Sequence, residues 1–179
     1  MKEYIFIDFE MDVNCDNNPE QIIAIGAIKT NNNGEIIDSY ESYSKLKNKP
    51  FLYRYTTFLT GIKDSNLKNS PSFKNNLIEL EKFIGQSTEI YCWGDCDLKC
   101  LKKTSNLNNI KSELLENNMK DFREFLPKKY RKYYWEKLFN IAKEFKIIEK
   151  NKNQKHNSIE DAIILKEIFF KMKEDEQNG

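Results

Sequence analysis

The sequence predicts a single domain of the α/β class, built on a mixed β-sheet whose first three strands are antiparallel. Two observations lead to this class: three strand-like segments follow one another early in the chain, and helical periodicity alternates with short strand-like runs after them. A chain of 179 residues can bury roughly 70% of the surface that its unfolded form exposes, which suffices for its own core. We therefore expect one domain over residues 1–179, with a polar tail at 174–179 that frays.

Four segments have the pattern of β-strands. Residues 3–9 are apolar at consecutive positions, as in a central strand that is buried on both faces. Residues 22–29 and 35–43 follow, with a turn at 32–34 between them. So short a turn reverses the chain, which predicts an antiparallel meander. Residues 89–93 predict a further short strand.

The rest of the chain is predominantly helical in pattern. Residues 73–84 place apolar side chains at helical spacing, and Gly85 provides a C-terminal stop. The segment 112–126 is ambiguous, part helix with a short strand around 119–122 as an option. The predicted helices are 73–84, 95–103, 133–145 and 158–173.

Charge and hydropathy exclude two classes of protein. The 29 basic and 28 acidic residues nearly cancel, so a protein that holds a polyanion by overall charge is excluded, and such a contact would need a local patch or bound cations. No stretch approaches the ~18 apolar residues of a membrane span. The N-terminus lacks the apolar core of a secretory signal. We expect a cytoplasmic protein without a membrane partner.

The four cysteines predict free thiols. Cys15, Cys92, Cys96 and Cys100 occur in a chain without secretory features, where disulfides are rare. The last three recur at every fourth residue, which leaves a zinc site as a minor alternative. No histidine lies nearby to complete such a site, so packed thiols are favoured.

Two acidic motifs follow predicted strands. Asp8 and Glu10 are two residues apart at the end of the first strand, so they point to one face. A strand that simply ends in solvent explains them equally well. The motif at 93–97 contains Asp95 and Asp97 where a helix begins, and the helix dipole accounts for acids there without any chemistry.

A third motif opens the last predicted helix. Ser158 and Asp161 resemble an N-terminal cap pair, so a structural explanation is available for them. His156 is the only histidine of the chain and is not needed for a cap. A lone histidine is more often structural than catalytic, so this motif carries little weight by itself.

Taken together and in this order, the three motifs resemble those of the DEDDh exonucleases, in the RNase T/DnaQ-like group of the ribonuclease H-like superfamily. That family has Asp-x-Glu on its first strand, an Asp after a middle strand, and His-x4-Asp before its last helix. The matching residues are Asp8, Glu10, Asp97, His156 and Asp161.

The resemblance extends from residue 4 to about residue 172. Asp97 matches the middle acid better than Asp95 because Leu98 and Leu101 follow it. The loop at 59–62 is similar to one that many members carry. Within the family, the chain looks closest to the exonucleases that trim histone mRNA ends or small RNAs, together with bacterial sporulation-inhibitor relatives.

The resemblance implies a 3′→5′ exonuclease that releases nucleoside 5′-monophosphates from single-stranded RNA or DNA, with RNA somewhat favoured. Two carboxylates 4 Å apart repel by ~4 kcal/mol at an effective dielectric of 20, so converging acids require cations. Two Mg²⁺ or Mn²⁺ ions suit such oxygen ligands. The implied ligands are Asp8, Glu10, Asp97 and Asp161, and His156 is the implied general base for the attacking water.

Substrate contacts are expected around the first motif. By the resemblance, the terminal nucleotide meets a set formed by Phe9, Glu10, Met11, Trp93 and His156. Trp93 could stack on a base or fill the core. The basic and aromatic run at 128–135 could guide a phosphate backbone, or could be a solvated basic face whose aromatic residues pack inward.

Two positions depart from the family pattern. Asp12 stands where members often have Thr or Ser, and it would add negative charge near the 3′ end of a substrate. Gln21 stands where many have Glu. These departures put the usual nucleotide contacts in doubt and leave the five matching residues untouched.

Two other hypotheses remain open at this stage. The chain could be a regulatory binding module with a nuclease-like fold and no turnover, as the sporulation-inhibitor likeness suggests; the intact acids and His156 count against it. Alternatively, the acids could be coincidental helix caps, which requires three motifs to fall in family order by accident.

Overall fold

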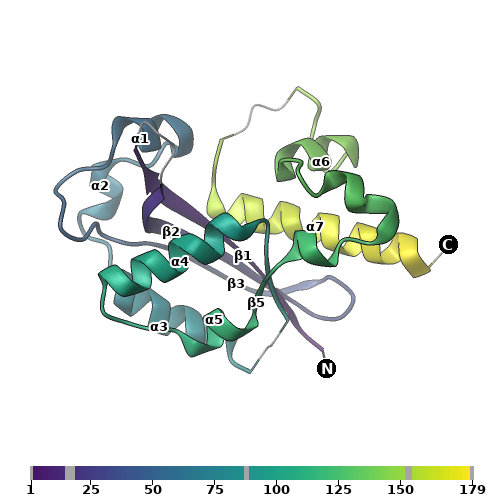
Figure 1. Cartoon of the computed structure of the whole chain (residues 1–179), viewed down its shortest axis with the longest axis horizontal. Coiled ribbons are helices and arrows are strands. Elements are labelled where there is room, and N and C mark those ends of the chain that lie inside the picture. The colour runs from purple at the N-terminus through teal and green to yellow at the C-terminus, as the bar shows by residue number, and fades with distance from the viewer. Residues whose placement is uncertain (1, 15–18, 87–88, 152–154, 178–179) are drawn as a thin grey trace.

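The fold is a five-stranded mixed sheet with helices on both faces, as predicted (Figure 1). The structure is a computed structural model that describes residues 2–14, 19–86, 89–151 and 155–177. The strands are β1 (Tyr4–Val13), β2 (Pro19–Thr30), β3 (Ile36–Tyr43), β4 (Ile90–Cys92) and β5 (Met119–Asp121), in the order β3-β2-β1-β4-β5.

The strand directions confirm the predicted meander. β1 pairs antiparallel with β2, and β2 pairs antiparallel with β3. β4 lies parallel to β1 on its other side, and β5 lies parallel to β4. β1 is therefore the central strand, and its apolar residues are buried on both faces.

Nine helical segments lie in the described part of the chain. They are α1 (Arg54–Thr60), α2 (Asp64–Leu67), α3 (Phe73–Ile84), α4 (Asp95–Leu107), α5 (Glu113–Asn118), the 3₁₀ segments η1 (Phe122–Phe125) and η2 (Lys128–Tyr133), α6 (Leu138–Glu144) and α7 (Ser158–Gln177). None of these helices is long and apolar enough to cross a membrane.

Several helices differ from the sequence prediction. α1 and α2 were not predicted because they are too short to show an apolar period. The helix expected over 133–145 begins only at Leu138, since the backbone at Lys137 is extended (φ −72°, ψ 137°) and separates α6 from η2. α7 continues to Gln177, although a frayed tail was predicted from residue 174 onward. Residues 178–179 lie outside the part of the chain that the structure describes.

Alternate residues of β1 face two different cores. Ile5, Ile7 and Phe9 pack on the side of α3 and α4. Tyr4 and Phe6 pack on the side of α6 and α7. Figure 1 shows these two groups of helices on opposite sides of the sheet. By the period of two in a strand, Asp8 belongs to the face of Tyr4 and Phe6 and therefore looks toward α7.

Aromatic side chains hold α7 against the sheet. The ring of Phe169 lies 5.1 Å from that of Tyr4 and 5.2 Å from those of Phe6, Tyr91 and Phe122, measured between centroids. Tilted and edge-on ring pairs at this separation are favourable beyond the area that they bury. The aromatic content of the chain thus fixes the position of the last helix.

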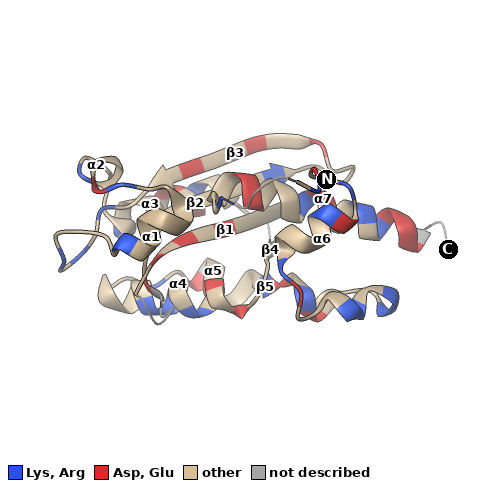
Figure 2. Cartoon of the chain, turned by 90° about the horizontal axis from the view of Figure 1, so that it is seen from above, with Lys and Arg blue, Asp and Glu red and all other residues tan. Residues whose placement is uncertain are grey.

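Charged residues are spread over the whole molecule. Figure 2 shows Lys and Arg interspersed with Asp and Glu rather than gathered on one face. This distribution agrees with the formal net charge of +1. No overall electrostatic surface therefore attracts or repels a large partner, and local groups decide binding.

Gly26 allows the start of α7 to touch the sheet. It lies directly opposite Asp8 in the register of β1 and β2. A β-carbon built at Gly26 would be 2.2 Å from the carbonyl carbon of Ser158, which is well inside van der Waals contact. Only glycine leaves room for the helix backbone there, so Gly26 sets how near Asp161 comes to Asp8.

We predict that Gly26→Ala lowers the free energy of unfolding by about 3 kcal/mol, because backbone must move to admit the methyl group. The melting temperature should fall by roughly 6–12 °C in thermal denaturation followed by circular dichroism. Gly61→Ala is the control: no atom lies within 4 Å of its added β-carbon, and only its φ of +75° opposes the change. A Gly26→Ala loss no larger than the control's would contradict this account.

Candidate active site

Four carboxylates converge at one end of the sheet. Asp8 and Glu10 come from β1, Asp97 from the first turn of α4, and Asp161 from the first turn of α7. Asp97, Glu10 and Asp161 are only 5%, 6% and 8% exposed, and Asp8 is half-buried. The three motifs that lie far apart in the sequence therefore meet in one site.

The acids strongly perturb one another. Burial, followed by the charges of Asp161 and Asp97, raises the pKa of Glu10 to about 8. Burial is also the main cause that raises the pKa of Asp97 to about 8, against a hydrogen bond from the backbone of Phe9 that lowers it. The pKa of Asp8 is raised well above its usual range by burial and then by Asp97 and Glu10. Such a cluster holds protons at neutral pH unless a cation replaces them.

The donor set fits a divalent metal. Ligand atoms of Glu10, His156 and Asp161 all lie within 4.8 Å of one another. Glu10 Oε1 is buried and has no hydrogen-bond partner within the described residues, as expected of an oxygen kept for a cation. Carboxylate oxygens are the ligands that Mg²⁺ and Mn²⁺ prefer. The structure thus places His156 beside the acids that the sequence proposed as ligands.

His156 separates two small cavities beside the acids. One, of about 270 Å³, is lined by Asp8, Trp93, Lys137, Leu138, Phe139, His156 and Asp161. The other, of about 100 Å³, is lined by His156 together with Glu10 and Thr60, among others. The backbone N–H of His156 donates to the carbonyl oxygen of Leu59 at 3.4 Å, which ties it to α1. Burial, and secondly the charge of Lys137, lowers the pKa of His156 below its usual 6.5, so its ring is neutral at pH 7.

The structure separates Asp97 from Asp95 as the sequence comparison proposed. Asp95 is exposed and forms ion pairs with Lys99 at 2.5 Å and with Arg123 at 3.5 Å. Asp97 is buried and electrostatically coupled to Asp8. Burial without an ion pair distinguishes the acid of the site from its solvated neighbour.

Trp93 packs in the core and also borders the site, and stacking of a base on it stays a prediction. Its ring packs on Phe122, with centroids 6.3 Å apart, and its Nε1–H donates to the carbonyl oxygen of Glu136 at 3.2 Å. The same side chain lines the 270 Å³ cavity beside Asp8. It is therefore both a packing residue and a wall of the site.

The side chain of Phe9 points away from Asp8 and Glu10, so only its backbone could make the predicted substrate contact. Phe9 is 4% exposed and packs in the core on the side of α3 and α4, opposite the acids, because it is out of phase with Asp8 and Glu10 along β1. Met11 is half-buried, and its sulfur lies 3.9 Å from that of Cys96. A substrate contact by Met11 stays a prediction.

Asp12 belongs to the scaffold and not to the acid cluster. It is fully buried, and its carboxylate accepts from Lys49 Nζ at 2.6 Å, from the backbone N–H of Tyr53 at 3.0 Å and from Thr56 Oγ1 at 2.8 Å. Its charge is thus neutralised by a segment that leads into α1. Gln21 acts similarly, with its amide bonded to the backbone of Lys47. Both departures from the family pattern anchor the chain between β3 and α1.

The cysteine alternative finds no support. Cys92 and Cys100 are buried, Cys96 is exposed, and all three have free thiols; Cys15 lies outside the described residues. The candidate metal cluster within the described chain contains no cysteine. The predicted packed thiols are therefore confirmed for Cys92 and Cys100, whereas Cys96 is exposed.

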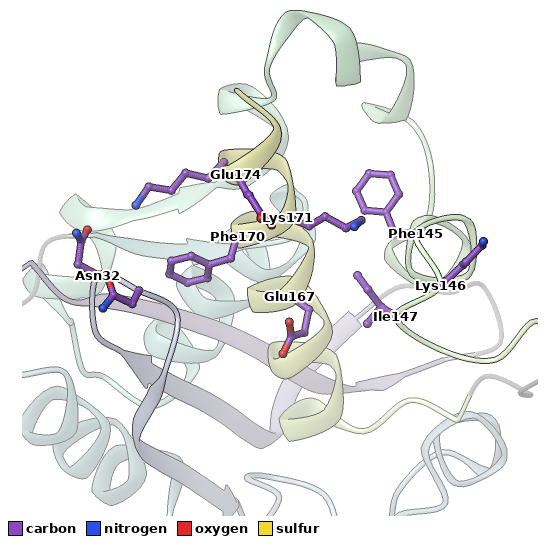
Figure 3. A pocket seen from close by; sticks show the side chains of 10 residues that line it. Asn32, Phe145, Lys146, Ile147, Glu167, Phe170, Lys171 and Glu174 are labelled. Carbon is purple, nitrogen blue, oxygen red and sulfur yellow. The ribbon is translucent and has the colours of Figure 1, made fainter. Parts of the chain in front are cut away.

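A larger cavity lies away from the acids. It measures about 730 Å³ and is formed between α7, the turn after β2 and the segment after α6, with Phe145, Ile147, Glu167 and Phe170 in its walls (Figure 3). It contains neither histidine nor a cluster of acids. The acids and the histidine lie instead along the smaller cavities.

One residue of the site had no sequence signal. Lys137 lines the 270 Å³ cavity with Asp8 and His156, yet it lies in none of the three motifs. It comes close only because the chain between η2 and α6 folds back over the end of the sheet. Nothing in its local sequence distinguishes it from the other lysines.

Comparison with known proteins agrees with this architecture. The model of the RNase T exonuclease family matches residues 5–169. No curated protein matches the chain by sequence. The nuclease domain of 3′hExo, a DEDDh family member bound to rAMP, superposes with a TM-score of 0.82 at 19% identity, over 97% of this chain and 92% of that one.

Two further solved structures share the fold. A 3′-exonuclease in a structure of histone mRNA stem-loop recognition has a TM-score of 0.81 at 19% identity, over 97% of this chain and 64% of that one. Exonuclease I of E. coli, in complex with a dT13 oligonucleotide, has a TM-score of 0.71 at 14% identity, over 97% and 41%. The chain thus spans less than two thirds of either protein.

We predict that the metal-free protein loses stability as the pH rises from about 4 to about 8. In this window the folded acids retain protons that the unfolded chain has released, so the free energy of unfolding falls with pH. Asp8→Asn removes one charge and should raise the melting temperature in EDTA at pH 8 by roughly 3–6 °C, since one pKa unit corresponds to about 1.4 kcal/mol. Equal melting temperatures of variant and wild type across this range would contradict the electrostatic account.

Asp12→Ala should destabilise the fold by about 3–5 kcal/mol, because it leaves Lys49 and the donors of Tyr53 and Thr56 without their shared acceptor. Urea denaturation measures this loss. Asp95→Ala is the matched control, since it removes an exposed ion pair that contributes about 0–1 kcal/mol. Similar losses in the two variants would show that the Asp12 contacts are not structural.

Proposed function

The chain belongs to the RNase T exonuclease family, and on that premise we propose that it is a divalent-metal-dependent 3′→5′ exonuclease acting on single-stranded RNA or DNA. The observation that carries the proposal is the meeting of Asp8, Glu10, Asp97 and Asp161 with the only histidine. Acids without ion pairs are costly to bury unless they bind cations. Their retention in one site is explained by metal-assisted phosphodiester hydrolysis.

The acids would hold one or two Mg²⁺ or Mn²⁺ ions. Bound metal would supply charge neutralisation for an entering phosphodiester and for the charge that develops on its oxygens. The carboxylates of Asp8 and Glu10 are held by the central strand, and those of Asp97 and Asp161 by helix N-terminal turns. The protein's part is to keep these four groups together against their mutual repulsion.

His156 is suited to accept a proton. A water molecule attacks phosphorus and the imidazole takes the proton that the water loses. The bond from phosphorus to the 3′ oxygen breaks, and that oxygen takes up a proton from solvent. The products are a nucleoside 5′-monophosphate and a strand shortened by one nucleotide, with a free 3′ hydroxyl. The lowered pKa of His156 keeps its ring neutral at pH 7, as a base requires.

We infer the 3′ end and the single strand as substrate features from the solved structures that share this fold. The similar structures include 3′hExo bound to rAMP, a 3′-exonuclease that recognises a histone mRNA stem-loop, and E. coli exonuclease I in complex with dT13. The cavity beside Asp8 is walled by Trp93, Leu138 and Phe139, which suit the flat face of an unpaired base or sugar. We place RNA somewhat ahead of DNA.

The wild-type protein should shorten a 5′-labelled single strand in steps of one nucleotide with Mg²⁺ or Mn²⁺, and EDTA should abolish the ladder. Asp8→Ala should reduce the rate by about 10³-fold or more, because it removes several kcal/mol of metal-assisted stabilisation. His156→Ala should reduce kcat by about 10²- to 10⁴-fold, which is typical for loss of a general base. Gel electrophoresis of timed samples provides the measurement.

Asp95→Ala serves as the matched control, because Asp95 lies two residues from Asp97 and is solvated. Its activity should stay within about twofold of the wild type, as expected for loss of a surface ion pair. A ladder that persists in Asp8→Ala would refute the assigned site. Metal-induced thermal stabilisation without any cleavage of RNA or DNA would favour the regulatory binding module instead.

A further inference from the structure

The basic and aromatic run at 128–135 does not act as one surface. The hydroxyls of Tyr130, Tyr133 and Tyr134 each donate to a carboxylate, those of Asp175, Glu144 and Glu124 respectively. The rings of Tyr130 and Tyr133 pack on Phe145. These tyrosines are therefore structural, as in the inward-packing alternative.

Two of the lysines in this run are already paired. Lys132 Nζ lies 3.2 Å from a carboxylate oxygen of Glu144, and Lys129 Nζ lies 4.0 Å from one of Asp175. Their charges are balanced within the protein. The segment as a whole is thus a poor general patch for phosphate.

Trp135 departs from this pattern. It is 87% exposed, the highest value among the exposed large hydrophobic residues. Its ring leans edge-on against Tyr134, with centroids 4.8 Å apart, and the next residue is held because Trp93 donates to the carbonyl oxygen of Glu136. An indole on an anchored backbone, with its face open to solvent, is a platform for another flat ring.

Lys137 follows Trp135 by two residues along the chain. It is exposed, and no ion pair involves its ammonium within the part of the chain that the structure describes. It lines the 270 Å³ cavity with Asp8, His156 and Asp161. Trp135 is two residues away, so at most about 7 Å of backbone separates the two α-carbons.

We propose that Trp135 and Lys137 form the entry path for the nucleic acid strand, an inference that rests on the proposed exonuclease function. The base of a nucleotide upstream of the cleaved bond stacks on Trp135, and a phosphate oxygen of the same stretch binds the ammonium of Lys137. The partner is an unpaired strand of at least two nucleotides. A base in a duplex has both faces covered and does not stack there.

The positive charge of Lys137 counteracts the negative charge of the acid site. Four carboxylates repel an approaching polyanion even when cations neutralise part of their charge. A cation at the rim of the same cavity offsets this repulsion for the phosphates that remain outside the metal site. Because the chain carries little net charge, such a local cation has a larger relative effect than on a basic protein.

The test compares two substrates of different length. Thymidine 5′-monophosphate p-nitrophenyl ester has p-nitrophenolate in place of an upstream nucleotide, whereas oligothymidylate offers bases to Trp135. In Trp135→Ala, the ratio of the KM for the oligonucleotide to the KM for the ester should rise about tenfold, the scale of one lost base stack. Trp135→Phe keeps an aromatic face, so its KM ratio should stay close to that of the wild type.

Lys137 is tested through the dependence on salt. For single strands, each phosphate contact contributes about 0.7 to the slope of log affinity against log salt concentration. Lys137→Ala should reduce the slope of log KM for oligothymidylate by about this amount. Phe51→Ala and Lys74→Ala are the matched controls, since both side chains are exposed on other parts of the surface.

The outcomes separate this inference from the proposed function. A wild-type protein that hydrolyses neither substrate would refute the exonuclease itself. Degradation of oligothymidylate with an unchanged KM ratio in Trp135→Ala and an unchanged salt slope in Lys137→Ala would overturn the entry path alone. A rise of equal size in Phe51→Ala would also overturn it, because the effect would not belong to this surface.

Discussion

Repulsion among four carboxylates is the constraint on which the rest of the structure depends. Asp8, Glu10, Asp97 and Asp161 would separate if the elements that carry them could move. Ring packing around Phe169 and the backbone contact at Gly26 hold the last helix against the central strand. Packing of the core thus supplies the free energy that keeps these like charges together. Bound divalent cations would relieve the repulsion between them.

The buried acids of this chain fall into two groups with different physical roles. Asp12 and Asp121 each have a cationic partner, Lys49 at 2.6 Å and Arg123 at 2.7 Å, and they also accept backbone N–H groups. No such ion pair serves Asp8, Glu10 or Asp97 among the described residues, and their pKa values are raised in consequence of burial. The first group stabilises local structure, whereas the second remains available to ligands. Burial alone does not distinguish them; the presence of an internal cation does.

The proposed substrate path follows from the same charge balance. Near η2, Tyr133 and Lys132 both bind the carboxylate of Glu144, so part of the charge there is balanced within the protein. Trp135 is exposed, and Lys137 lines the cavity beside Asp8 without an ion pair among the described residues. With a net charge near zero, binding of a polyanion would depend on a few placed groups, and single substitutions of these groups would change it strongly.

The sequence by itself determined the central strand, the meander, the helix that ends at Gly85, and the five residues of the site. The spacing of apolar residues indicates which positions are buried, and the order of the three motifs identifies the acids that match those of the family. Only the tertiary structure decided that Asp12 is neutralised by Lys49 and that Lys137 reaches the site. The reason is that local pattern reports which side chains are buried or solvated, whereas neutralisation and access depend on groups brought together from distant parts of the chain. Gly26 is the clearest case, because its requirement comes from the backbone of Ser158, which lies 2.2 Å from where a β-carbon would be.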